Sequence, residues 1–322
     1  MAIDVTILRC PRCGGGLRTG VDGRLECGCG AAYPVVDGIP RFVRRSGDRA
    51  EERTRRAFEI EWQRFGGEER LYGGTAAESM RLLFDEFNQP ELSAQWVRGR
   101  RVLDGGCGHG RYVRGMAELG ADAYGIDLGF GIDVAARRCA GIANVALVQG
   151  SLLEPPFAPQ SFDLVFSKGV VHCTPDPPGA VARMAELVKP GGYLFVWVYP
   201  RYPDWFLLSQ EAIRHVTKRM PAPLLIPLCF AVAPLLGVML RRGVGVATHA
   251  TATDRSFART TLRERAQMVY DWYSPWYQSY HSPQEVADWL RRSGFTDLRS
   301  CPIPAGASGR RAVAPPSSAP SA

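Results

Sequence analysis

A glycine-rich turn after a short apolar run constrains the fold of this chain more than any other stretch of its sequence. The run RVLDGGCGHGRYV covers residues 101–113, and four glycines fall within six positions of it: Gly105, Gly106, Gly108 and Gly110. Aliphatic residues that lead directly into glycines predict a buried parallel strand, a turn whose backbone closely approaches a ligand, and a helix from about Arg111. Turns of this kind bind nucleotide-like ligands. The dinucleotide fingerprint G-x-G-x-x-G does not fit, because its last glycine would fall on Arg111 or on Val113.

Strand and helix patterns alternate along the residues that follow this turn. Apolar strand segments are predicted at 122–127, 144–150, 162–167 and 193–198, with helices near 131–140 and 178–188. Alternation of this kind is typical of a parallel sheet covered by helices on both faces. We therefore expect an α/β fold with a Rossmann-like, doubly wound and mostly parallel sheet. In such sheets a ligand lies beyond the carboxyl ends of the strands, where the strand order reverses.

Further helix and strand signals flank this region. A polar connector at 41–56 leads into an amphipathic helix around FEIEWQRF at 58–65, and a second helix is predicted over 76–96. Near the C-terminus, SPQEVADWLRRSGF has a capping box on Ser282 and Glu285, which predicts a well-defined last helix. FTDLRSCPI is expected to follow as the sixth strand, and only SGRRAVAP is a candidate for a seventh.

The glycine turn also fits the pattern D-x-G-x-G-x-G, on Asp104, Gly106, Gly108 and Gly110. In this pattern the chain resembles motif I of the class I S-adenosylmethionine-dependent methyltransferases, in which the turn packs under the methionine part of the cofactor. Three later segments complete the resemblance: VQGSLLEPPF, SFDLVFSKGVVHCTPDP and LVKPGGYLFVWVYP. The resemblance covers about residues 101–200 and implies an enzyme that transfers a methyl group from S-adenosyl-L-methionine.

The resemblance also implies which side chains bind the cofactor. Asp104 would orient the methionine ammonium, and Asp127, at the end of the second strand, would accept hydrogen bonds from both ribose hydroxyls. Ser151 replaces the family's aspartate that accepts from the adenine amino group, which weakens this contact by about 1 kcal/mol. Leu152 would cover one face of the adenine. The candidates for cofactor binding are Asp104, Gly105, Gly106, Cys107, Gly108, Gly110, Asp127, Leu128, Ser151, Leu152 and Ser167.

Methyl transfer to an aligned acceptor depends on positioning and on exclusion of water more than on acid or base chemistry. A general base is needed only when the acceptor is a hydroxyl or a protonated amine. His172, just past the fourth strand, is the catalytic candidate for that role, whereas His109 is expected to shape the glycine turn. Asp271 and His281 frame the aromatic stretch DWYSPWYQSYH, which either walls the acceptor pocket or packs in the core.

Four of the nine cysteines lie near the start of the chain with a spacing that suits a metal. Cys10 and Cys13 form C-P-R-C, and Cys27 and Cys29 follow in LECGCG. Two cysteine pairs on glycine-rich turns can surround a tetrahedral Zn²⁺, which stabilises a segment too short to build a core. The stretch resembles the small zinc-ribbon module that precedes some bacterial methyltransferase domains, although that module usually has C-x-x-C where this chain has C-x-C. A degenerate ribbon with a structural role only is the alternative to a zinc site.

An apolar stretch, APLLIPLCFAVAPLLGVML at 222–240, lies in a segment inserted between the fifth strand and the last helix. Its nineteen residues are long enough for a membrane span. Prolines are expected to break a helix here, and basic pairs at both ends give a span no clear orientation. We expect an apolar cap over the substrate site, with shallow membrane contact as the next alternative and a true span as the least favoured. The residues concerned are Pro223, Pro227, Pro234, Lys218, Arg219, Arg241 and Arg242.

The net charge of +7 does not by itself indicate binding to nucleic acid. Only Lys168, Lys189 and Lys218 are lysines, and such a bias toward arginine is more consistent with base composition than with a phosphate-binding surface. The ribbon through Pro40 has four arginines against four acids, whereas phosphate contacts need concentrated positive charge. We expect a small, fairly apolar methyl acceptor, with oxygen, nitrogen and carbon all open as the acceptor atom. The alternatives are an RNA methyltransferase and a non-catalytic cofactor-binding scaffold.

These observations divide the chain into five parts. They are a zinc-ribbon-like module at 1–43, a helical connector or lid at 44–97, the methyltransferase domain at 98–200 and 281–313, a helical cap insertion at 201–280, and a tail at 314–322 that is expected to be disordered. No basic segment leads into an apolar stretch at the start, so no secretory signal is expected and the predicted location is cytoplasmic.

Overall fold

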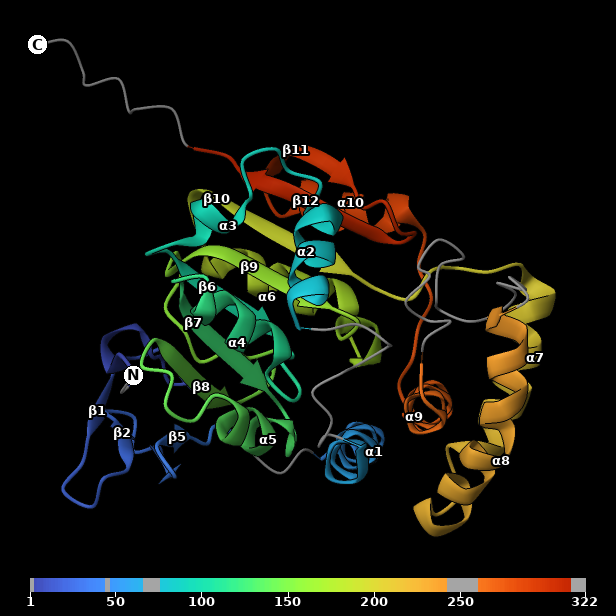
Figure 1. Cartoon of the computed structure of the whole chain (residues 1–322). Coiled ribbons are helices and arrows are strands. Elements are labelled where there is room, and N and C mark those ends of the chain that lie inside the picture. Colours follow the sequence, from blue (N-terminus) through green and yellow to red (C-terminus); the bar gives the residue numbers. More distant parts are fainter. Residues whose placement is uncertain (1–2, 44–46, 66–75, 242–259, 314–322) are drawn as a thin grey trace, which may run out of the picture.

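A seven-stranded sheet is the centre of the computed structural model, which describes residues 3–43, 47–65, 76–241 and 260–313. The strands lie in the order β11-β12-β10-β9-β6-β7-β8 (Figure 1). Neighbouring strands from β6 to β10 are parallel, and β12 runs antiparallel to both β10 and β11. The mostly parallel, Rossmann-like sheet is therefore confirmed, together with both predicted C-terminal strands. The bounds are β6 Arg101–Gly105, β7 Asp122–Asp127, β8 Val145–Gln149, β9 Phe162–Lys168, β10 Val188–Trp197, β11 Phe295–Ser300 and β12 Gly306–Arg311.

Helices cover both faces of this sheet. Neighbouring residues of β6, Val102 and Leu103, belong to separate apolar cores, because side chains alternate across a strand. The predicted capping box starts the last helix: Ser282 Oγ accepts from the Glu285 amide at 3.2 Å, and Glu285 accepts from the Ser282 amide at 2.7 Å. One face carries α2 Ala76–Phe87, α4 Arg111–Glu118 and α5 Gly131–Arg138, and the other carries α6 Pro177–Leu187 and α10 Pro283–Arg292.

The order of the parallel strands reverses between β6 and β9. From β6 the chain continues outward to β7 and β8, and it then returns to the other side of β6 to form β9 and β10. The carboxyl ends of β6 and β9 therefore border the crevice in which ligands bind to sheets of this type. The glycine turn follows β6 directly and lies at this point.

The helix predicted over 76–96 is two helices in the structure. α2 ends at Phe87, and the short α3, Ala94–Val97, begins after a turn. Asn88 has a φ of +51°, in the left-handed region, and Pro90 has no amide hydrogen to continue a helix. The Asn88 side chain donates to the Ser300 carbonyl at 2.9 Å, so this turn is attached to the edge of the sheet.

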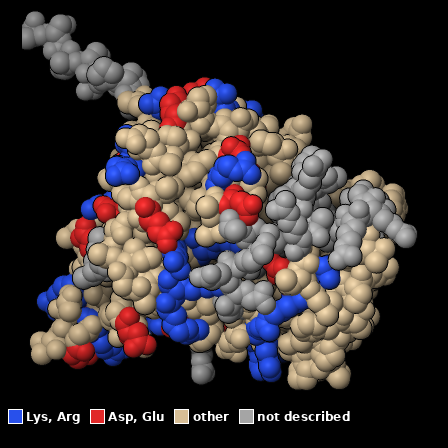
Figure 2. Space-filling model, in the orientation of Figure 1, with Lys and Arg blue, Asp and Glu red and all other residues tan. Residues whose placement is uncertain are grey.

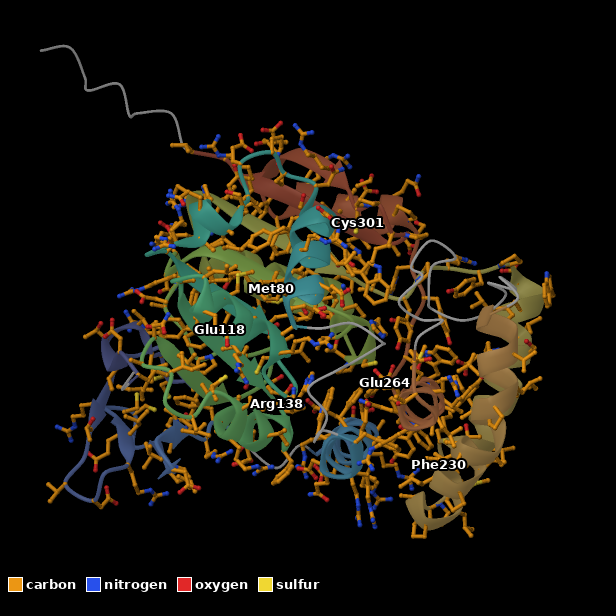
Figure 3. All side chains as sticks on the ribbon, in the orientation of Figure 1. Met80, Glu118, Arg138, Phe230, Glu264 and Cys301 are labelled. Carbon is orange, nitrogen blue, oxygen red and sulfur yellow. The ribbon has the colours of Figure 1, made fainter. Side chains whose placement is uncertain are left out.

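Among the described residues, three helices lie between β10 and α10: α7 Asp204–Thr217, α8 Ala222–Arg241 and α9 Leu262–Tyr273. α8 runs through Pro227 and Pro234, so the prediction that prolines break the helix here is wrong. Both prolines are exposed, so water can reach the carbonyls that lose an amide partner, while the buried side of α8 packs on α9. Phe230 on α8 and Glu264 on α9 mark this pair in Figure 3. Within the described residues, no helix combines the length and the apolar character that crossing a bilayer requires.

The N-terminal segment forms a small unit of short strands that packs on the sheet. Leu8 is fully buried, in the same apolar cluster as Phe157. The Arg9 amide donates to the Pro156 carbonyl at 3.0 Å, and the Phe42 amide donates to the Gln149 carbonyl at 2.8 Å. The elements are η1 Val5–Ile7, β1 Leu17–Thr19, β2 Leu25–Cys27, β3 Ala32–Tyr33, β4 Val35–Val36 and β5 Ile39–Pro40, followed by the helix α1 Arg49–Phe65. The tail predicted at 314–322 lies outside the described residues.

Candidate active site

The glycine turn after β6 adopts backbone conformations that glycine takes without strain. Gly106, Gly108 and Gly110 have φ values of +82°, +48° and +79°. A Cβ atom on Gly106 would lie 2.3 Å from a methyl carbon of Val170, and one on Gly108 would lie 2.8 Å from the Trp62 ring. Both the conformation and the close packing therefore require glycine at these two positions.

Asp127, at the end of β7, is bound to this turn. Its Oδ2 accepts a hydrogen bond from the Gly108 amide at 2.8 Å, and its Oδ1 accepts from the Gly129 amide at 2.8 Å. Burial raises the pKa of Asp127 to about 6, so the side chain is ionised at neutral pH. Each carboxylate oxygen can accept a further hydrogen bond, and Asp127 lines a cavity. The side chain therefore fits a pair of adjacent hydroxyls such as those of a ribose.

Asp104, in β6, is 4% exposed and lines the same cavity. Its Oδ2 has no hydrogen-bond partner among the described residues. Burial, and next the charge on Asp127, raise the pKa of Asp104 well above its usual range. A buried carboxyl oxygen without a partner costs free energy unless a ligand brings a donor or a cation. The two carboxyls thus fit the ammonium and the ribose of S-adenosylmethionine, which are the groups that the sequence resemblance assigns to them.

The other cofactor candidates divide into residues that line the cavity and residues that support it. Ser167 Oγ donates to the Gly105 carbonyl at 2.7 Å and so joins β9 to β6, and neither residue lines the cavity. Gly110 starts α4, where a Cβ would lie 2.7 Å from Ala135. Ser151 Oγ accepts from the amide of Leu153 at 3.2 Å. The candidates that line the cavity besides the two aspartates are Gly106, Cys107, Gly108, Leu128, Ser151 and Leu152.

A helix that the sequence did not assign to the site, α1, packs on the glycine turn. The Trp62 ring lies flat on the His109 ring, with 4.6 Å between ring centroids and 9° between ring planes. Phe58, Glu61 and Trp62 all line the cavity. The aromatic spacing in FEIEWQRF predicted the helix correctly, but no sequence signal indicated what its aromatic face would contact.

A second polar group lines the cavity, where α9 meets the chain after β10. Asp271 Oδ2 accepts a hydrogen bond from the Tyr199 hydroxyl at 2.5 Å. Burial raises the pKa of Asp271, although Tyr199 and the Arg214 charge both act to lower it. His172, the catalytic candidate from the sequence, is 1% exposed and stacks on Tyr199 with 3.9 Å between ring centroids. It does not line the cavity, so its link to the site is through Tyr199.

The segment 201–280 contributes to the cavity wall through α9 rather than α8. Met268, Asp271 and Trp272 line the cavity, and no described residue of 222–240 does. The expectation that 222–240 caps the site is therefore corrected, because α8 packs on α9, which itself lines the cavity. In the aromatic stretch, Trp272 lines the cavity and also belongs to an apolar core cluster. Trp276 does neither: it is half-buried and packs with basic side chains.

One cavity of about 650 Å³ brings these groups together. Arg81 pairs with Asp85 at 3.3 Å and Lys168 pairs with Glu86 at 2.6 Å. Basic and acidic side chains are also interspersed over the face seen in Figure 2. In the described wall, Arg81 and Lys168 are thus each paired with an acid. Its acidic residues are Glu51, Glu61, Asp85, Glu86, Asp104, Asp127 and Asp271, and its basic residues are Arg55, Arg81, Arg111 and Lys168.

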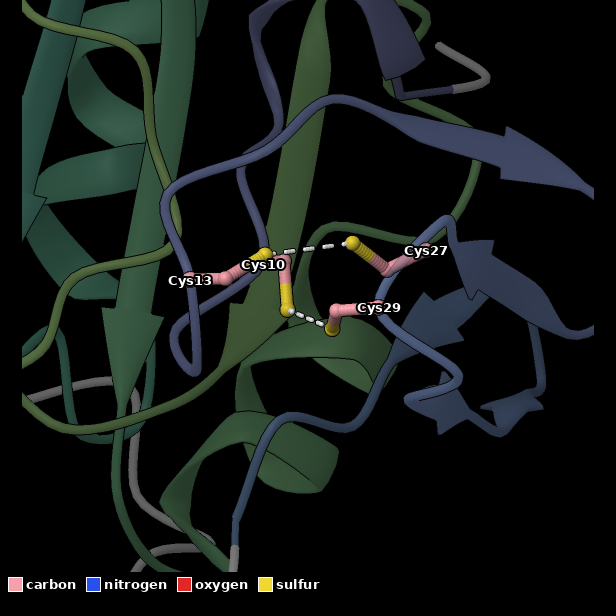
Figure 4. A group of neighbouring side chains, drawn as sticks. All are labelled: Cys10, Cys13, Cys27 and Cys29. Carbon is pink, nitrogen blue, oxygen red and sulfur yellow. Dashed lines mark hydrogen bonds between the residues drawn. The ribbon is translucent and has the colours of Figure 1, made fainter.

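The four cysteines predicted as metal ligands converge in the N-terminal unit (Figure 4). Their Sγ atoms all lie within 4.8 Å of one another, with 3.7 Å between Cys10 and Cys29 and 3.4 Å between Cys13 and Cys27. Zn–S bonds of about 2.3 Å in a tetrahedral site separate the sulfur atoms by about 3.8 Å. The thiols therefore fit Zn²⁺, and the shorter C-x-C spacing does not prevent their convergence.

Comparison with known families finds a match between residues 103–196 and the family described as a methyltransferase domain. The matched residues run from β6 into β10 and include the glycine turn, Asp104 and Asp127. Residues 103–196 thus have the sequence pattern of a methyltransferase domain, and they lie in the sheet and the site described above.

Curated relatives of this chain include O-methyltransferases of ubiquinone biosynthesis. That of Leptothrix cholodnii is 34% identical over 146 residues, which are 42% of this chain and 59% of the relative. That of Paracidovorax citrulli is 37% identical over 131 residues, 39% of this chain and 54% of the relative. The chain thus spans less than three fifths of the length of these relatives. Among solved structures, magnesium protoporphyrin IX methyltransferase from Synechocystis PCC 6803 with bound SAH aligns over 80% of this chain and 98% of that chain, at 14% identity and a TM-score of 0.44.

Proposed function

We propose that this chain is an S-adenosylmethionine-dependent methyltransferase that acts on a small molecule in the cavity beside the glycine turn. The observation that carries the proposal is the placement of the buried Asp104 and the half-buried Asp127 on adjacent strands beside that turn. Asp104 has an oxygen without a partner among the described residues, and both oxygens of Asp127 accept from backbone amides. A buried carboxyl oxygen without a partner costs free energy, so a protein that bound no ligand here would be destabilised by Asp104 without any gain.

S-adenosylmethionine, when bound, supplies a methyl group on a positively charged sulfur. The residues of this chain would position it: Asp104 at the ammonium, Asp127 at the ribose, and Leu128 and Leu152 at the adenine. Trp62 packs over the turn and excludes water from it. Alignment of two reacting groups in a site without water lowers the activation barrier by about 7–11 kcal/mol in the best cases. Positioning of the cofactor and the acceptor can therefore supply most of the catalysis.

The charge of the cavity wall favours a small molecule over RNA. Seven acidic and four basic side chains are among its described lining residues, and Arg81 and Lys168 are paired with acids. An RNA substrate would need unpaired cations around an opening wide enough for an extruded base and its phosphates. A volume of about 650 Å³ is instead in the range of small-ligand sites.

We propose oxygen as the acceptor atom, because the curated relatives are O-methyltransferases. Residues of α1 and α9 line the cavity and lie outside the family match at 103–196. The identity of the acceptor is therefore set by parts of this chain that the family match does not include.

For the N-terminal module, we propose one Zn²⁺ on Cys10, Cys13, Cys27 and Cys29, with a structural role. The convergence of the four thiols supports this proposal. We also propose that the chain is divided into the module at 1–43, the connector at 44–97, the methyltransferase domain at 98–200 and 281–313, and the insertion at 201–280. In this division the connector and the insertion supply α1 and α9 to the wall of the methyltransferase site.

Transfer of a labelled methyl group tests the proposed function. Purified protein is incubated with methyl-labelled S-adenosylmethionine and, separately, with a metabolite extract below 1 kDa or with total RNA. We expect label in the small-molecule fraction, and its loss in the variant Asp104→Asn. Label incorporated into RNA would instead favour the RNA methyltransferase. Label in neither fraction, with binding of S-adenosylmethionine retained, would favour the cofactor-binding scaffold.

A further inference from the structure

A pair of acidic side chains on α1 and α9 forms a polar group in the cavity that the binding of S-adenosylmethionine does not use. Glu61, on α1, is 1% exposed and lines the cavity. Its Oε1 accepts from Gln267 Nε2 at 2.9 Å, and its Oε2 has no hydrogen-bond partner among the described residues. Gln267 lies one helical turn before Asp271, so α9 presents both to the same side.

Glu61 and Asp271 line the same cavity, and the charge on Asp271 acts on the ionisation of Glu61. Burial raises the pKa of Glu61 well above its usual range, and the charge on Asp271 adds to this effect. Asp271 has a different environment, because it accepts from the Tyr199 hydroxyl and is influenced by the Arg214 guanidinium. Two neighbouring carboxyls in an apolar setting do not readily both ionise, so a state in which the pair holds one proton and one negative charge is favoured.

The surroundings of this pair are aromatic and apolar. Arg214 is buried, and its charge acts to lower the pKa of Asp271. Its guanidinium donates to the backbone carbonyls of Trp272 and Pro275 at 2.6 and 2.9 Å. Apart from the charge of Arg214, the groups that donate to the pair are the neutral Gln267 amide and Tyr199 hydroxyl. The acceptor oxygens of the pair therefore attract a hydrogen-bond donor and repel an anion. The apolar and aromatic residues that line the cavity are Phe58, Trp62, Leu82, Trp197, Met268, Trp272 and Ile303.

We propose that Glu61 and Asp271 bind the methyl acceptor, and that this acceptor is an uncharged ring compound that presents a hydroxyl group to the pair. The proposal rests on the function proposed above and names its substrate class. The flat aromatic wall contacts the ring, Glu61 and Asp271 accept from its hydroxyl, and Tyr199 positions Asp271. His172, which stacks on Tyr199, contributes to the same positioning.

The pair also accounts for the proton that O-methylation releases. As the new O–CH₃ bond forms, the S–CH₃ bond breaks and its electron pair stays on sulfur. The O–H bond of the acceptor breaks in the same step, and its proton passes to the ionised carboxylate of the pair. A base in this position contributes about 10²- to 10⁴-fold to the rate.

The test uses the full chain loaded with S-adenosylhomocysteine and two probes that share a dihydroxyphenyl ring, neutral catechol and 3,4-dihydroxybenzoate, which adds an anionic carboxylate. For wild type we expect at least tenfold weaker binding of the anion than of catechol. In Asp271→Asn this preference should fall below threefold, because the charge is gone. Glu61→Gln should weaken the binding of catechol at least fivefold and keep the preference for catechol over the anion.

The rate of methylation gives a second test. Asp271→Asn should slow catechol methylation by S-adenosylmethionine at least 100-fold, and Tyr199→Phe should slow it less.

The control variant is Asp288→Asn, an exposed carboxyl on α10 outside the cavity wall, which should leave all these values unchanged. Thermal melting checks that each variant is folded. Affinity for S-adenosylmethionine should stay within twofold in Glu61→Gln and Asp271→Asn. If either variant loses that affinity as Asp127→Asn does, the pair serves the cofactor and the inference is wrong. Failure of catechol to bind the loaded wild type, or unchanged binding in both variants, would also overturn it. Failure of wild type to bind S-adenosylmethionine would contradict the proposed function instead.

Discussion

The Trp62 ring lies flat on the His109 ring, with 4.6 Å between centroids, and so brings α1 onto the glycine turn between β6 and α4. The same indole lies where a side chain at Gly108 would have to go. This contact couples a helix near the N-terminus to the backbone that approaches the cofactor. It explains how a segment outside the family match becomes part of the site.

Substitution of Gly108 by alanine should weaken binding of S-adenosylmethionine by at least about tenfold. The new Cβ would lie 2.8 Å from the Trp62 ring, and the φ of +48° is unfavourable for alanine. Gly141→Ala is the matched control, because Gly141 has a φ of +82° with no atom within 4 Å. That variant should lose about 1 kcal/mol of stability with unchanged affinity. Equal affinities for both alanine variants in calorimetry would mean that Trp62 does not constrain the turn.

Acidification should weaken cofactor binding. Burial places the pKa of Asp127 at about 6, so at pH 5 only about one tenth of the molecules carry the ionised acceptor. We expect roughly tenfold weaker binding of S-adenosylmethionine at pH 5 than at pH 7. A titration series from pH 5 to 8 measures it, and a flat profile would contradict the assignment of Asp127.

The same group has the opposite effect on folding. Because the pKa of Asp127 is higher in the folded chain than its ordinary value of 3.8, protonation favours the folded state. Its contribution to stability should therefore increase as the pH falls from above 6 toward 4. Denaturant unfolding of wild type and Asp127→Asn without cofactor compares the two slopes, and a steeper loss of stability in wild type on acidification would contradict this sign.

The features that could be predicted correctly from the sequence depend on residues close to one another in the chain. The glycine turn, the strand ends at Asp104 and Asp127, and the capping box at Ser282 depend on neighbours a few residues away, and all were found. The partners of α1 and α9 could not be predicted, since nothing in the sequence pairs Trp62 with His109 or Tyr199 with Asp271. These contacts join residues 47 and 72 positions apart, and they depend on tertiary packing.

The same limit explains the errors over 222–240. Three prolines within an apolar run favoured a broken helix, yet α8 is continuous because its prolines lie on the exposed side. The run also lies against α9 rather than over the cavity. A propensity rule could not foresee either result, because both depend on which side of the helix another element covers.

Loss of the metal should reduce cofactor affinity as well as the stability of the N-terminal unit. Leu8 and Arg9, next to Cys10, contact Phe157 and Pro156, in the loop that follows Leu152. We expect Cys10→Ser to lose the bound zinc and to weaken S-adenosylmethionine by about 1 kcal/mol, roughly fivefold. Elemental analysis and calorimetry measure the two effects, with Cys139→Ser as a control that keeps the metal. Zinc-free wild type after purification without chelators would exclude the metal site.

Shallow membrane contact is the next alternative to a cap for residues 222–240, and it predicts that the outer side of α8 binds anionic membranes. Leu224, Leu228 and Leu235 are 64%, 44% and 62% exposed, and Lys218 and Arg219 precede the helix. In sedimentation with vesicles rich in phosphatidylserine, Leu228→Glu/Leu235→Glu should remain in the supernatant while wild type pellets. Val21→Glu, at an isolated exposed valine of the N-terminal unit, should behave as wild type. A wild type that stays in the supernatant, or that covers this side by forming a dimer, would refute the prediction.

Calorimetric titration of S-adenosylmethionine into wild type and Asp127→Asn tests directly whether this chain binds the cofactor with Asp127 at the ribose. We expect one site per chain in wild type, and a loss of at least about 1.5 kcal/mol of binding free energy in the variant, because the ribose hydroxyls lose a charged acceptor. Wild type that binds a nicotinamide dinucleotide but not S-adenosylmethionine, or a variant that binds S-adenosylmethionine as tightly as wild type, would contradict it.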